Sequence, residues 1–384
     1  YKVSNTKVFL NKFAKIKRNL SNSKFIGITG SSGKTTVKTM IGNLLNIYEK
    51  TYFSPNSYNN HFGVPLSLSN MNIFHKFGVF EIGMSRPNEI YKLTAMVKPH
   101  IGIITNISVA HLENFKNING IAKAKSEIIY KIKKGGVIIL NRDDKFFSFL
   151  SKIANKNQIR VRSFGYSTKS NIRFKSIKNL RNGYELNLIC EKKIIKLNVE
   201  SNNKNHIMNI MCSLSVIEEM GLDLNKIKYF FQKYSILKGR GKIHKIKNFR
   251  KRFFLIDESY NANPLSVKSA IQNFENINKR GNKKYFLFGD MLELGNKSHF
   301  YHRQVSDQIN KSDIDKTFVF GNKSIETFNY LKKNKKGSIV TNLKNFHIHI
   351  SKILKNGDYL MIKGSNATKL HEVSKKILEV NNAI

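Results

Sequence analysis

The stretch Phe25-Ile-Gly-Ile-Thr-Gly-Ser-Ser-Gly-Lys-Thr-Thr36 constrains the fold of this chain more than any other feature. An apolar run typical of a buried strand ends in a turn of Gly and Ser, and a helical pattern follows from Val37 to Leu45. Small residues let backbone N–H groups close around phosphate oxygens, and the N-terminus of the helix adds partial positive charge. The alternative is an ordinary Gly-rich turn, and Ile28 indeed stands where a strict G-x-x-x-x-G-K-[ST] loop has its first Gly. The Gly-Lys-Thr sequence between a strand and a helix nevertheless favours a phosphate-binding loop.

Two side chains of this loop carry the expected nucleotide chemistry. Lys34 can reach the outer phosphates, and the Thr35 hydroxyl can hold a Mg²⁺ ion. We therefore predict a bound triphosphate as the ligand. The residues of the loop predicted to bind it are Gly30, Ser31, Ser32, Gly33, Lys34, Thr35 and Thr36.

Strands and helices alternate along the chain in two series. The first is expected to form strands at 77–82, 100–107 and 136–140, helices at 87–97 and 118–130, several short strands in 160–200, and helices in 205–234. The second is expected to form strands at 253–257, 285–289, 317–321, 338–341 and 359–363. Such alternation is typical of a mostly parallel sheet covered by helices on both faces.

This pattern predicts an α/β fold in two main domains. Leu237-Lys-Gly-Arg-Gly-Lys242 reads as a linker because two glycines interrupt the pattern. We predict an N-terminal helical remnant at 1–22, a central P-loop NTPase-like domain at 23–238, and a smaller Rossmann-like domain at 239–384.

The net charge of +42 comes from 67 Lys and Arg residues against 25 Asp and Glu residues. A nucleic-acid-binding protein is one interpretation. The charge is spread along the chain rather than gathered in one stripe, which favours a general compositional bias and predicts no specific nucleic-acid partner. The charge would still attract anionic substrates.

Other features of the composition predict a cytoplasmic protein. No apolar run approaches the roughly 20 residues that span a bilayer, so we expect no membrane insertion. Cys190 and Cys212 have no metal-ligand spacing and are expected to be reduced thiols.

Three further candidate residues follow the predicted strands of the first series. Glu81, His111 and Lys125 would each be ordinary taken alone: a paired carboxylate, a structural histidine and a surface lysine. Function in open α/β sheets gathers at the carboxyl ends of strands. Together with the phosphate loop, a carboxylate, an imidazole and a Thr hydroxyl could serve Mg²⁺ on a bound triphosphate.

Several separate strings resemble the Mur ligases, the ATP-dependent amide-forming enzymes of peptidoglycan synthesis. They run in the family's order from about residue 24 to about residue 372, and they are closest to the branch that adds D-alanyl-D-alanine. The strings are Thr29-Gly-Ser-Ser-Gly-Lys-Thr-Thr36, Ser54-Pro-Asn-Ser-Tyr-Asn-Asn-His-Phe-Gly-Val-Pro65, Asn106-Ile-Ser-Val-Ala-His-Leu-Glu-Asn-Phe115, Ala122-Lys-Ala-Lys-Ser-Glu-Ile128, Asp257-Glu-Ser-Tyr-Asn-Ala-Asn-Pro264 and Phe288-Gly-Asp-Met-Leu-Glu-Leu-Gly295.

The resemblance implies roles for the residues of the first series. Lys34 would bind the β- and γ-phosphates, Thr35 and Glu81 would hold Mg²⁺, and His111 would help to bind a second Mg²⁺. Lys125 matches the lysine that the family carbamylates with CO₂, which makes it a fourth metal-site residue. Lys123 fits that position less well.

The resemblance also implies substrate and nucleotide contacts beyond the loop. Asn59, Asn60 and His61 would face the muramoyl peptide. Nucleotide contacts in the second domain would come from Arg240, Asn261, Asn263 and Asp290. The implied reaction joins D-alanyl-D-alanine to UDP-N-acetylmuramoyl-tripeptide through an acyl phosphate, with ATP and Mg²⁺, in a protein expected to be monomeric.

The sequence departs from the family's pattern in two places. In Lys363-Gly-Ser-Asn366, Asn366 stands where the family usually has Arg. Only about 20 residues precede the loop strand, so we expect the N-terminal UDP-binding domain of the family to be missing, in a fragment or in a naturally shortened protein. The alternatives are another amino-acid ligase of the superfamily, a non-catalytic remnant, or a nucleic-acid-binding P-loop protein.

Overall fold

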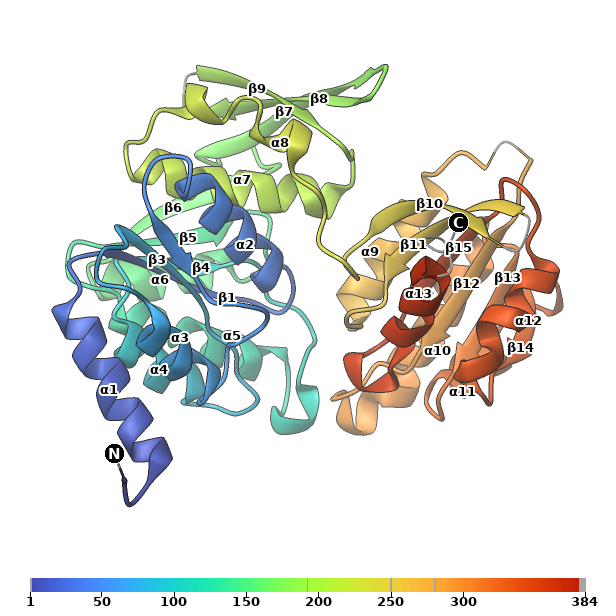
Figure 1. Cartoon of the computed structure of the whole chain (residues 1–384), viewed down its shortest axis with the longest axis horizontal. Coiled ribbons are helices and arrows are strands. Elements are labelled where there is room, and N and C mark those ends of the chain that lie inside the picture. Colours follow the sequence, from blue (N-terminus) through green and yellow to red (C-terminus); the bar gives the residue numbers. More distant parts are fainter. Residues whose placement is uncertain (1, 192, 249–250, 280, 380–384) are drawn as a thin grey trace. The chain divides into compact units, whose positions relative to one another are not determined.

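The computed structural model describes residues 2–191, 193–248, 251–279 and 281–379. The chain divides into two compact units (Figure 1). The first comprises residues 1–108 and 115–234, and the second comprises 109–114 and 235–384. This division lies near the predicted boundary at 238, while residues 1 and 380–384 of the predicted domains lie outside the described parts. The exact domain bounds therefore stay a prediction.

The first unit is built on a sheet of nine strands in the order β2-β3-β1-β4-β5-β6-β7-β8-β9 (Figure 1). The strands run parallel from β2 through β7, and β8 and β9 add antiparallel neighbours. Its strands are β1 (Lys24–Thr29), β2 (Thr51–Phe53), β3 (Phe77–Glu81), β4 (Ile101–Ile104), β5 (Val137–Asn141), β6 (Arg160–Gly165), β7 (Ile172–Leu180), β8 (Gly183–Cys190) and β9 (Lys193–Val199).

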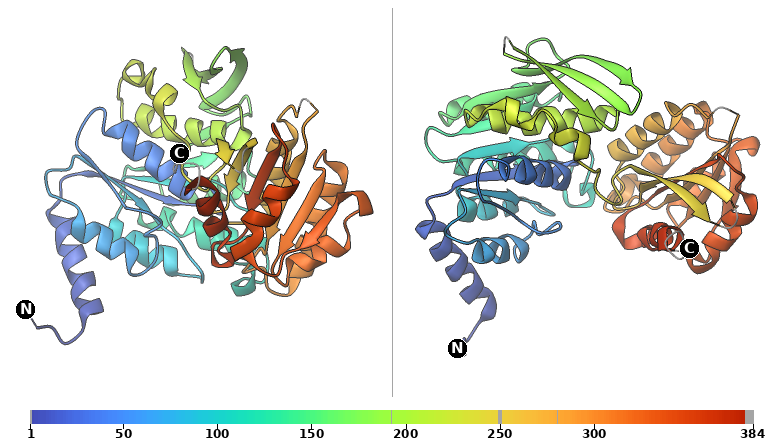
Figure 2. Two further views of the ribbon diagram at one scale, coloured as in Figure 1. Left: turned by 45° about the vertical axis from the view of Figure 1, so that its right-hand side comes forward. Right: turned by 45° about the horizontal axis from the view of Figure 1, so that its top comes forward.

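Helices cover both faces of this sheet (Figure 2). The helices of the unit are α1 (Thr6–Leu20), α2 (Lys34–Leu45), α3 (Gly63–Asn70), α4 (Glu89–Val97), α5 (Ile118–Ser126), α6 (Phe147–Lys156), α7 (Lys204–Glu219) and α8 (Phe230–Lys233). The central strands β3 and β4 are buried along their whole length, which is the pattern of parallel strands covered on both faces.

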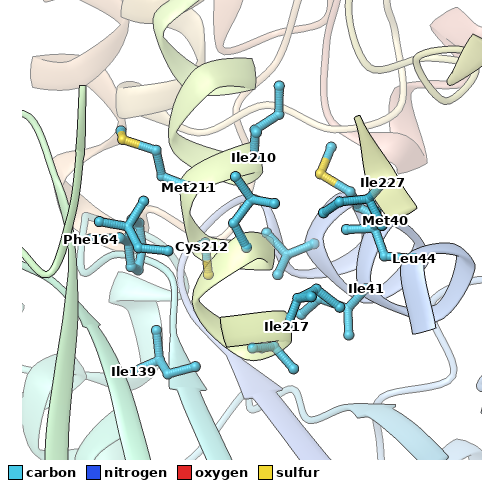
Figure 3. Packing of buried hydrophobic residues seen from close by; sticks show 14 of the residues in the cluster. Met40, Ile41, Leu44, Ile139, Phe164, Ile210, Met211, Cys212, Ile217 and Ile227 are labelled. Atoms are coloured by element: carbon cyan, nitrogen blue, oxygen red, sulfur yellow. The ribbon is translucent and has the colours of Figure 1, made fainter. Parts of the chain in front are cut away.

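One core fixes α2 and α7 together over the sheet. Met40, Ile41 and Leu44 of α2 pack with residues of α7 such as Ile210 and Ile217, beside the strand residues Ile139 and Phe164 (Figure 3). Because α2 begins at Lys34, this packing also fixes where the phosphate-binding loop ends.

Helix α1 is tied to the unit by Arg18. Its Nε donates to the carbonyl oxygen of Val97 at 2.5 Å, and its Nη2 donates to that of Lys98 at 2.8 Å. The guanidinium also lies over the Phe25 ring, 3.7 Å from its centroid. Burial lowers the pKa of Arg18 to about 10. The bonds satisfy the last carbonyls of α4, which have no partner within that helix.

The second unit has a six-stranded sheet in the order β10-β11-β15-β12-β13-β14. All neighbours are parallel except the edge strand β10, which is antiparallel to β11. Its strands are β10 (Lys242–Asn248), β11 (Lys251–Glu258), β12 (Lys284–Gly289), β13 (Lys316–Phe320), β14 (Lys336–Ile339) and β15 (Tyr359–Lys363).

Two cores lie on the two faces of this second sheet. Along β12, Phe286 and Phe288 enter one core while Tyr285 and Leu287 enter the other, as the two-residue period of a strand requires. Helices α9 (Pro264–Glu275) and α10 (Ser298–Lys311) complete the first core, and α12 (Phe346–Ile353) and α13 (Leu370–Glu379) complete the second. The short helix α11 (Ser324–Asn329) follows β13.

The predicted α/β fold with mostly parallel sheets is confirmed, and some predicted elements need correction. The predicted helix 118–130 ends at Ser126 and continues only as the 3₁₀ turn Ile129–Lys131. The predicted helix at 87–97 begins at Glu89 instead, because Asn88 adopts a left-handed conformation (φ 67°). The strand β10 occupies residues that follow directly on the predicted linker.

Both cysteines are free and buried. Burial raises the pKa of the Cys190 and Cys212 thiols. Within the described ranges, no helix combines the length and the apolar character that a membrane crossing needs.

Candidate active site

The phosphate-binding loop joins β1 to α2 in the first unit. Gly30 has φ 150°, and a Cβ atom there would lie 1.9 Å from Thr105 Oγ1, so only glycine fits. The Lys34 ammonium, at the first residue of α2, donates to the carbonyl oxygen of Gly30 at 2.9 Å. The cation therefore lies across the mouth of the loop, where an outer phosphate would bind.

The residues after β4 hold this loop in shape. The Asn106 side chain accepts from the Ser32 N–H at 3.1 Å, and its backbone carbonyl accepts from the Ser31 N–H at 3.0 Å. Thr105 Oγ1 donates to the Ser32 carbonyl at 2.6 Å. The loop conformation is thus built by the neighbouring strand end as well as by its own glycines.

Glu81 lies at the end of β3, one strand away from the loop. It is almost fully buried, and both carboxylate oxygens are bonded. Thr35 Oγ1 donates to Glu81 Oε2 at 2.8 Å, and Asn59 Nδ2 donates to Glu81 Oε1 at 2.7 Å. Three residues that the sequence singled out separately therefore lie together in the first unit.

This arrangement fits a magnesium ion by its donor chemistry. A hydroxyl and a carboxylate oxygen are hard ligands, and they lie beside a loop built for phosphate. Within the described residues, no group of three or more His, Cys, Asp or Glu side chains could hold a metal by itself. Such a sparse protein contribution suits Mg²⁺, which commonly keeps one or two carboxylates and completes its shell with substrate phosphates and water.

Lys125 of α5 is a buried lysine beside another cation, Lys34. It is 2% exposed. Burial, and next the positive charge of Lys34, lower the pKa of Lys125 well below its ordinary value. Both effects favour the neutral amine form of this side chain.

Two further predicted residues, Asn60 and His61, lie at the surface of the first unit. Asn60 Oδ1 accepts from the N–H groups of Phe62 and Gly63 at 3.1 and 2.9 Å, just before and at the start of α3. His61 is exposed, with its ring centroid 4.3 Å from that of Phe62.

His111 lies in the segment 109–114, which clusters with the second unit. Its Nδ1 is 2.6 Å from Glu293 Oε2, and its backbone is left-handed (φ 57°). Of the four expected metal residues, three lie in the first unit and His111 lies in the second. Its expected role at a second Mg²⁺ remains a prediction.

Arg240 lies on a turn held by Asp257 at the end of β11. Asp257 Oδ2 accepts from the Gly239 N–H at 2.9 Å, and the Tyr260 N–H donates to the Gly239 carbonyl at 3.2 Å. The Arg240 guanidinium stacks over the Tyr260 ring, 3.9 Å from its centroid. The stacking orients this arginine within the second unit.

The two predicted asparagines on the next loop have structural bonds as well. Asn261 Oδ1 accepts from the Ala262 N–H at 2.9 Å, and Asn263 Oδ1 accepts from the Ser266 N–H at 2.9 Å as the N-cap of α9. Lys363 at the end of β15 contacts this loop. Its ammonium donates to Glu258 Oε2 and to the Asn261 carbonyl, both at 3.1 Å.

Asp290 follows β12, and its carboxylate accepts hydrogen bonds from backbone N–H groups. Its Oδ1 accepts from the N–H groups of Lys323 and Ser324 at 3.1 and 2.7 Å, at the start of α11. Ser365 links the same region, because its Oγ accepts from the Leu292 N–H at 2.9 Å. Asn366, where the family usually has Arg, donates from Nδ2 to the Tyr260 carbonyl at 3.3 Å.

Sequence reasoning missed several residues that build this site. Asn106 and Asp144 both follow strands of the first sheet, and that position at the carboxyl end was the signal that could have found them. Asp144 Oδ2 accepts from the Ile107 N–H at 2.6 Å, and burial raises the pKa of its carboxyl. Lys38 offered no such signal, because lysine is abundant everywhere in this chain.

Comparison with known proteins identifies the family. Residues 28–217 match the Mur ligase middle domain, and residues 243–366 match the domain described as Mur ligase, glutamate ligase domain. The UDP-N-acetylmuramoyl-tripeptide–D-alanyl-D-alanine ligase of Buchnera aphidicola subsp. Baizongia pistaciae is 31% identical over 381 residues, which cover 98% of this chain and 80% of that protein. The enzyme of the same name from Rickettsia prowazekii is 30% identical, over 97% of this chain and 82% of that protein.

The fold agrees with these sequence matches. A crystal structure of MurF from Acinetobacter baumannii superposes with a TM-score of 0.87 at 25% identity, covering 98% of this chain and 81% of that one. The chain therefore belongs to the Mur ligase family, within its branch of UDP-N-acetylmuramoyl-tripeptide–D-alanyl-D-alanine ligases.

Proposed function

We propose that this chain forms the amide bond between UDP-N-acetylmuramoyl-tripeptide and D-alanyl-D-alanine at the expense of ATP, as a step of peptidoglycan precursor synthesis. The observation that carries the proposal is the loop in which Lys34 lies across a phosphate cradle while Thr35 and buried Glu81 bond to each other beside it. The substrates are those named for the relatives at 30 and 31% identity.

The first chemical step joins two anions, so the site must cancel charge. The terminal carboxylate of the tripeptide attacks the γ-phosphorus of ATP, the bond to the β-phosphate oxygen breaks, and an acyl phosphate and ADP result. Lys34 supplies one positive charge at the outer phosphates. Bound Mg²⁺, held by Thr35 and Glu81, would neutralise further charge on those phosphates.

Lys125 supports this site as a carbamate. A neutral amine attacks the carbon of CO₂, an N–C bond forms as one C=O π bond opens, and the nitrogen loses a proton to solvent to leave an anionic carbamate. The burial that lowers the pKa of Lys125 favours the neutral amine that this reaction needs. The product replaces a buried cation beside Lys34 by an anion, which reverses an unfavourable electrostatic pair.

The second step needs the neutral amine of D-alanyl-D-alanine to attack the acyl carbon, with phosphate as the leaving group. We assign nucleotide contacts to Arg240, Asn261, Asn263 and Asp290 and muramoyl-peptide contacts to Asn59, Asn60 and His61. The stacking of Arg240 on Tyr260 supports its assignment, because a guanidinium held in place loses less freedom when it binds an anion. His111 is assigned to a second Mg²⁺.

The test is phosphate release from ATP by the purified chain, with Mg²⁺ and bicarbonate. UDP-N-acetylmuramoyl-tripeptide and D-alanyl-D-alanine are supplied together and then omitted in turn. Release that requires both substrates is the expected result. Release that needs neither would identify an ATPase of another kind, and no release with all components present would overturn the proposal.

A further inference from the structure

Lys38 is a buried lysine of α2 that the proposed chemistry does not use. It is 1% exposed and lies one helical turn after Lys34. Its ammonium donates to the carbonyl oxygen of Ser54 at 2.5 Å and also to that of Asn56. A charge taken out of water in this way is costly unless its hydrogen bonds are made, so this contact defines the local structure.

The carbonyls that Lys38 binds belong to the loop that carries the proposed muramoyl-peptide residues. The same loop meets the metal residues at two more points. Ser57 Oγ lies 3.1 Å from Thr35 Oγ1, and Asn59 Nδ2 donates to Glu81 at 2.7 Å. The loop is therefore attached to the first two turns of α2 and to the end of β3.

The backbone of this loop depends on such contacts. Asn56 is left-handed, with φ 43°, a conformation that non-glycine residues keep only where their surroundings hold it. Its carbonyl is one of the two that Lys38 binds. Lys34, Thr35 and Lys38 lie within five residues on α2, so a displacement of the first helical turn also displaces the loop.

We propose that Lys38 is a positioning residue that couples the phosphate-binding helix to the muramoyl-peptide loop. The inference rests on the proposed function for the identity of the peptide substrate, although the coupling itself can be measured without turnover. Phosphate binding orders the start of α2, and Lys38 transmits that order to the carbonyls of Ser54 and Asn56. Loss of the ammonium should weaken binding of the peptide substrate more than binding of the nucleotide.

The main test compares Lys38→Met with the wild type. We expect the KM for UDP-N-acetylmuramoyl-tripeptide to rise about tenfold or more, because two hydrogen bonds from a charged donor are lost. The Kd for MgADP, measured by calorimetry, should change less than about threefold, because Lys34 and the loop amides remain. Lys38→Arg keeps a cation with several donors and should restore most of the affinity for the peptide.

A second readout does not need activity. In the wild type, MgADP should slow hydrogen exchange of the backbone amides of residues 54–59. In Lys38→Met this protection should be lost while MgADP still binds. If the wild type shows the protection but no peptide-dependent phosphate release, the proposed function fails and the coupling stands.

Lys284→Met is the matched control, since Lys284 is also a fully buried lysine. It lies in the second unit, 2.8 Å from Asp313, and should lower stability without a selective rise in the KM for the peptide. Three results would overturn the inference. They are an unchanged KM for the peptide in Lys38→Met, an equal rise in the KM for the peptide and the Kd for MgADP, or the same kinetic pattern in Lys284→Met.

A second variant covers the case in which Lys38→Met does not fold. Asn56→Gly keeps the carbonyl and every side chain of the site, but glycine frees the loop from its held conformation. The same selective rise in KM is expected, by a smaller factor. A KM for the peptide equal to that of the wild type would count against the proposed coupling.

Discussion

At the scale of single residues, the buried lysines of this chain differ in what surrounds the ammonium. Lys284 faces Asp313, Lys363 faces Glu258, and Lys38 faces backbone carbonyls. Lys125 is equally buried, and the charge that affects its pKa is that of another cation, Lys34. A cation in such a place costs stability, so a lysine there is expected to have a chemical function.

Lys34→Ala should reduce peptide-dependent phosphate release by a factor of about 10² to 10³, the usual effect of removing one group that stabilises developing charge. The variant should remain folded, because Lys34 is only partly buried at the edge of the loop. The measurement is steady-state phosphate release beside a thermal unfolding curve. A wild-type rate in a folded Lys34→Ala protein would refute the assignment of the loop.

Lys125→Met should stabilise the chain in CO₂-free buffer while removing activity. The folded pKa of Lys125 lies below its unfolded value near 10.5, so between the two values only the unfolded chain holds the proton. In that window the stability of the wild type rises with pH by up to about 1.4 kcal/mol per unit, and the variant lacks this contribution. The advantage of the variant should therefore shrink as pH rises.

The check is the free energy of unfolding of both proteins as the pH rises toward 10.5, the ordinary pKa of a lysine. Parallel profiles of the two proteins would mean that Lys125 has the same proton affinity in the folded and the unfolded chain, which would contradict the prediction. In a separate measurement, added bicarbonate should raise the stability of the wild type and leave that of the variant unchanged.

The residues that sequence reasoning found share a distinctive neighbour or motif. Lys34 and Thr35 follow a Gly-rich loop, and Glu81 ends a strand. The contact between Thr35 and Glu81 could be expected from the parallel pairing of β1 with β3. The contacts of Lys38 could not, because they depend on the course of an irregular loop that has no periodic signal.

At the scale of elements, α2 contains Gly42, although glycine has a low propensity to form a helix. Alanine is usually favoured over glycine within a helix by about 1 kcal/mol. A Cβ atom at Gly42, however, would lie 2.3 Å from Phe53 Cδ1 of β2. Gly42→Ala should therefore destabilise the first unit, by about 1 to 3 kcal/mol, because the ring must move.

Gly120→Ala in α5 is the matched comparison. Its Cβ would lie 3.4 Å from Phe115 Cδ1, an ordinary contact, and the variant should be neutral or stabilised by up to about 1 kcal/mol. Urea unfolding of both variants decides the question. A Gly42→Ala protein as stable as Gly120→Ala would show that Phe53 can give way at no cost.

Elements with strong apolar runs could be predicted from the sequence. Elements that form because a neighbouring strand pairs with them could not. The predicted strands at 285–289 and 359–363 match β12 and β15 closely, since both are buried in the middle of a sheet. β10 mixes Lys with Ile and His and has no long apolar run, and it forms because antiparallel pairing with β11 supplies its hydrogen bonds. The predicted helix at 118–130 stops early because a turn at Glu127 intervenes.

At the scale of the whole molecule, the two units have separate hydrophobic cores. We therefore expect two transitions in calorimetric unfolding. MgADP at about 100 times its Kd should stabilise the transition of the first unit by about 2.7 kcal/mol, because the phosphate loop belongs to that unit. Any stabilisation of the other transition would come from the nucleotide contacts proposed for the second unit. Lys34→Ala should reduce this shift, and a single transition that moves as one would contradict the expectation of independent cores.

The buried cysteines have a practical consequence for experiments on this protein. Cys190 and Cys212 are both hidden from solvent, and their thiols resist ionisation. Since the thiolate is the reactive form, maleimide dyes should not react with either cysteine in the folded chain. One cysteine introduced at an exposed position of each unit could then carry a fluorophore without background labelling, and energy transfer between the two dyes would report whether the distance between the units changes during turnover.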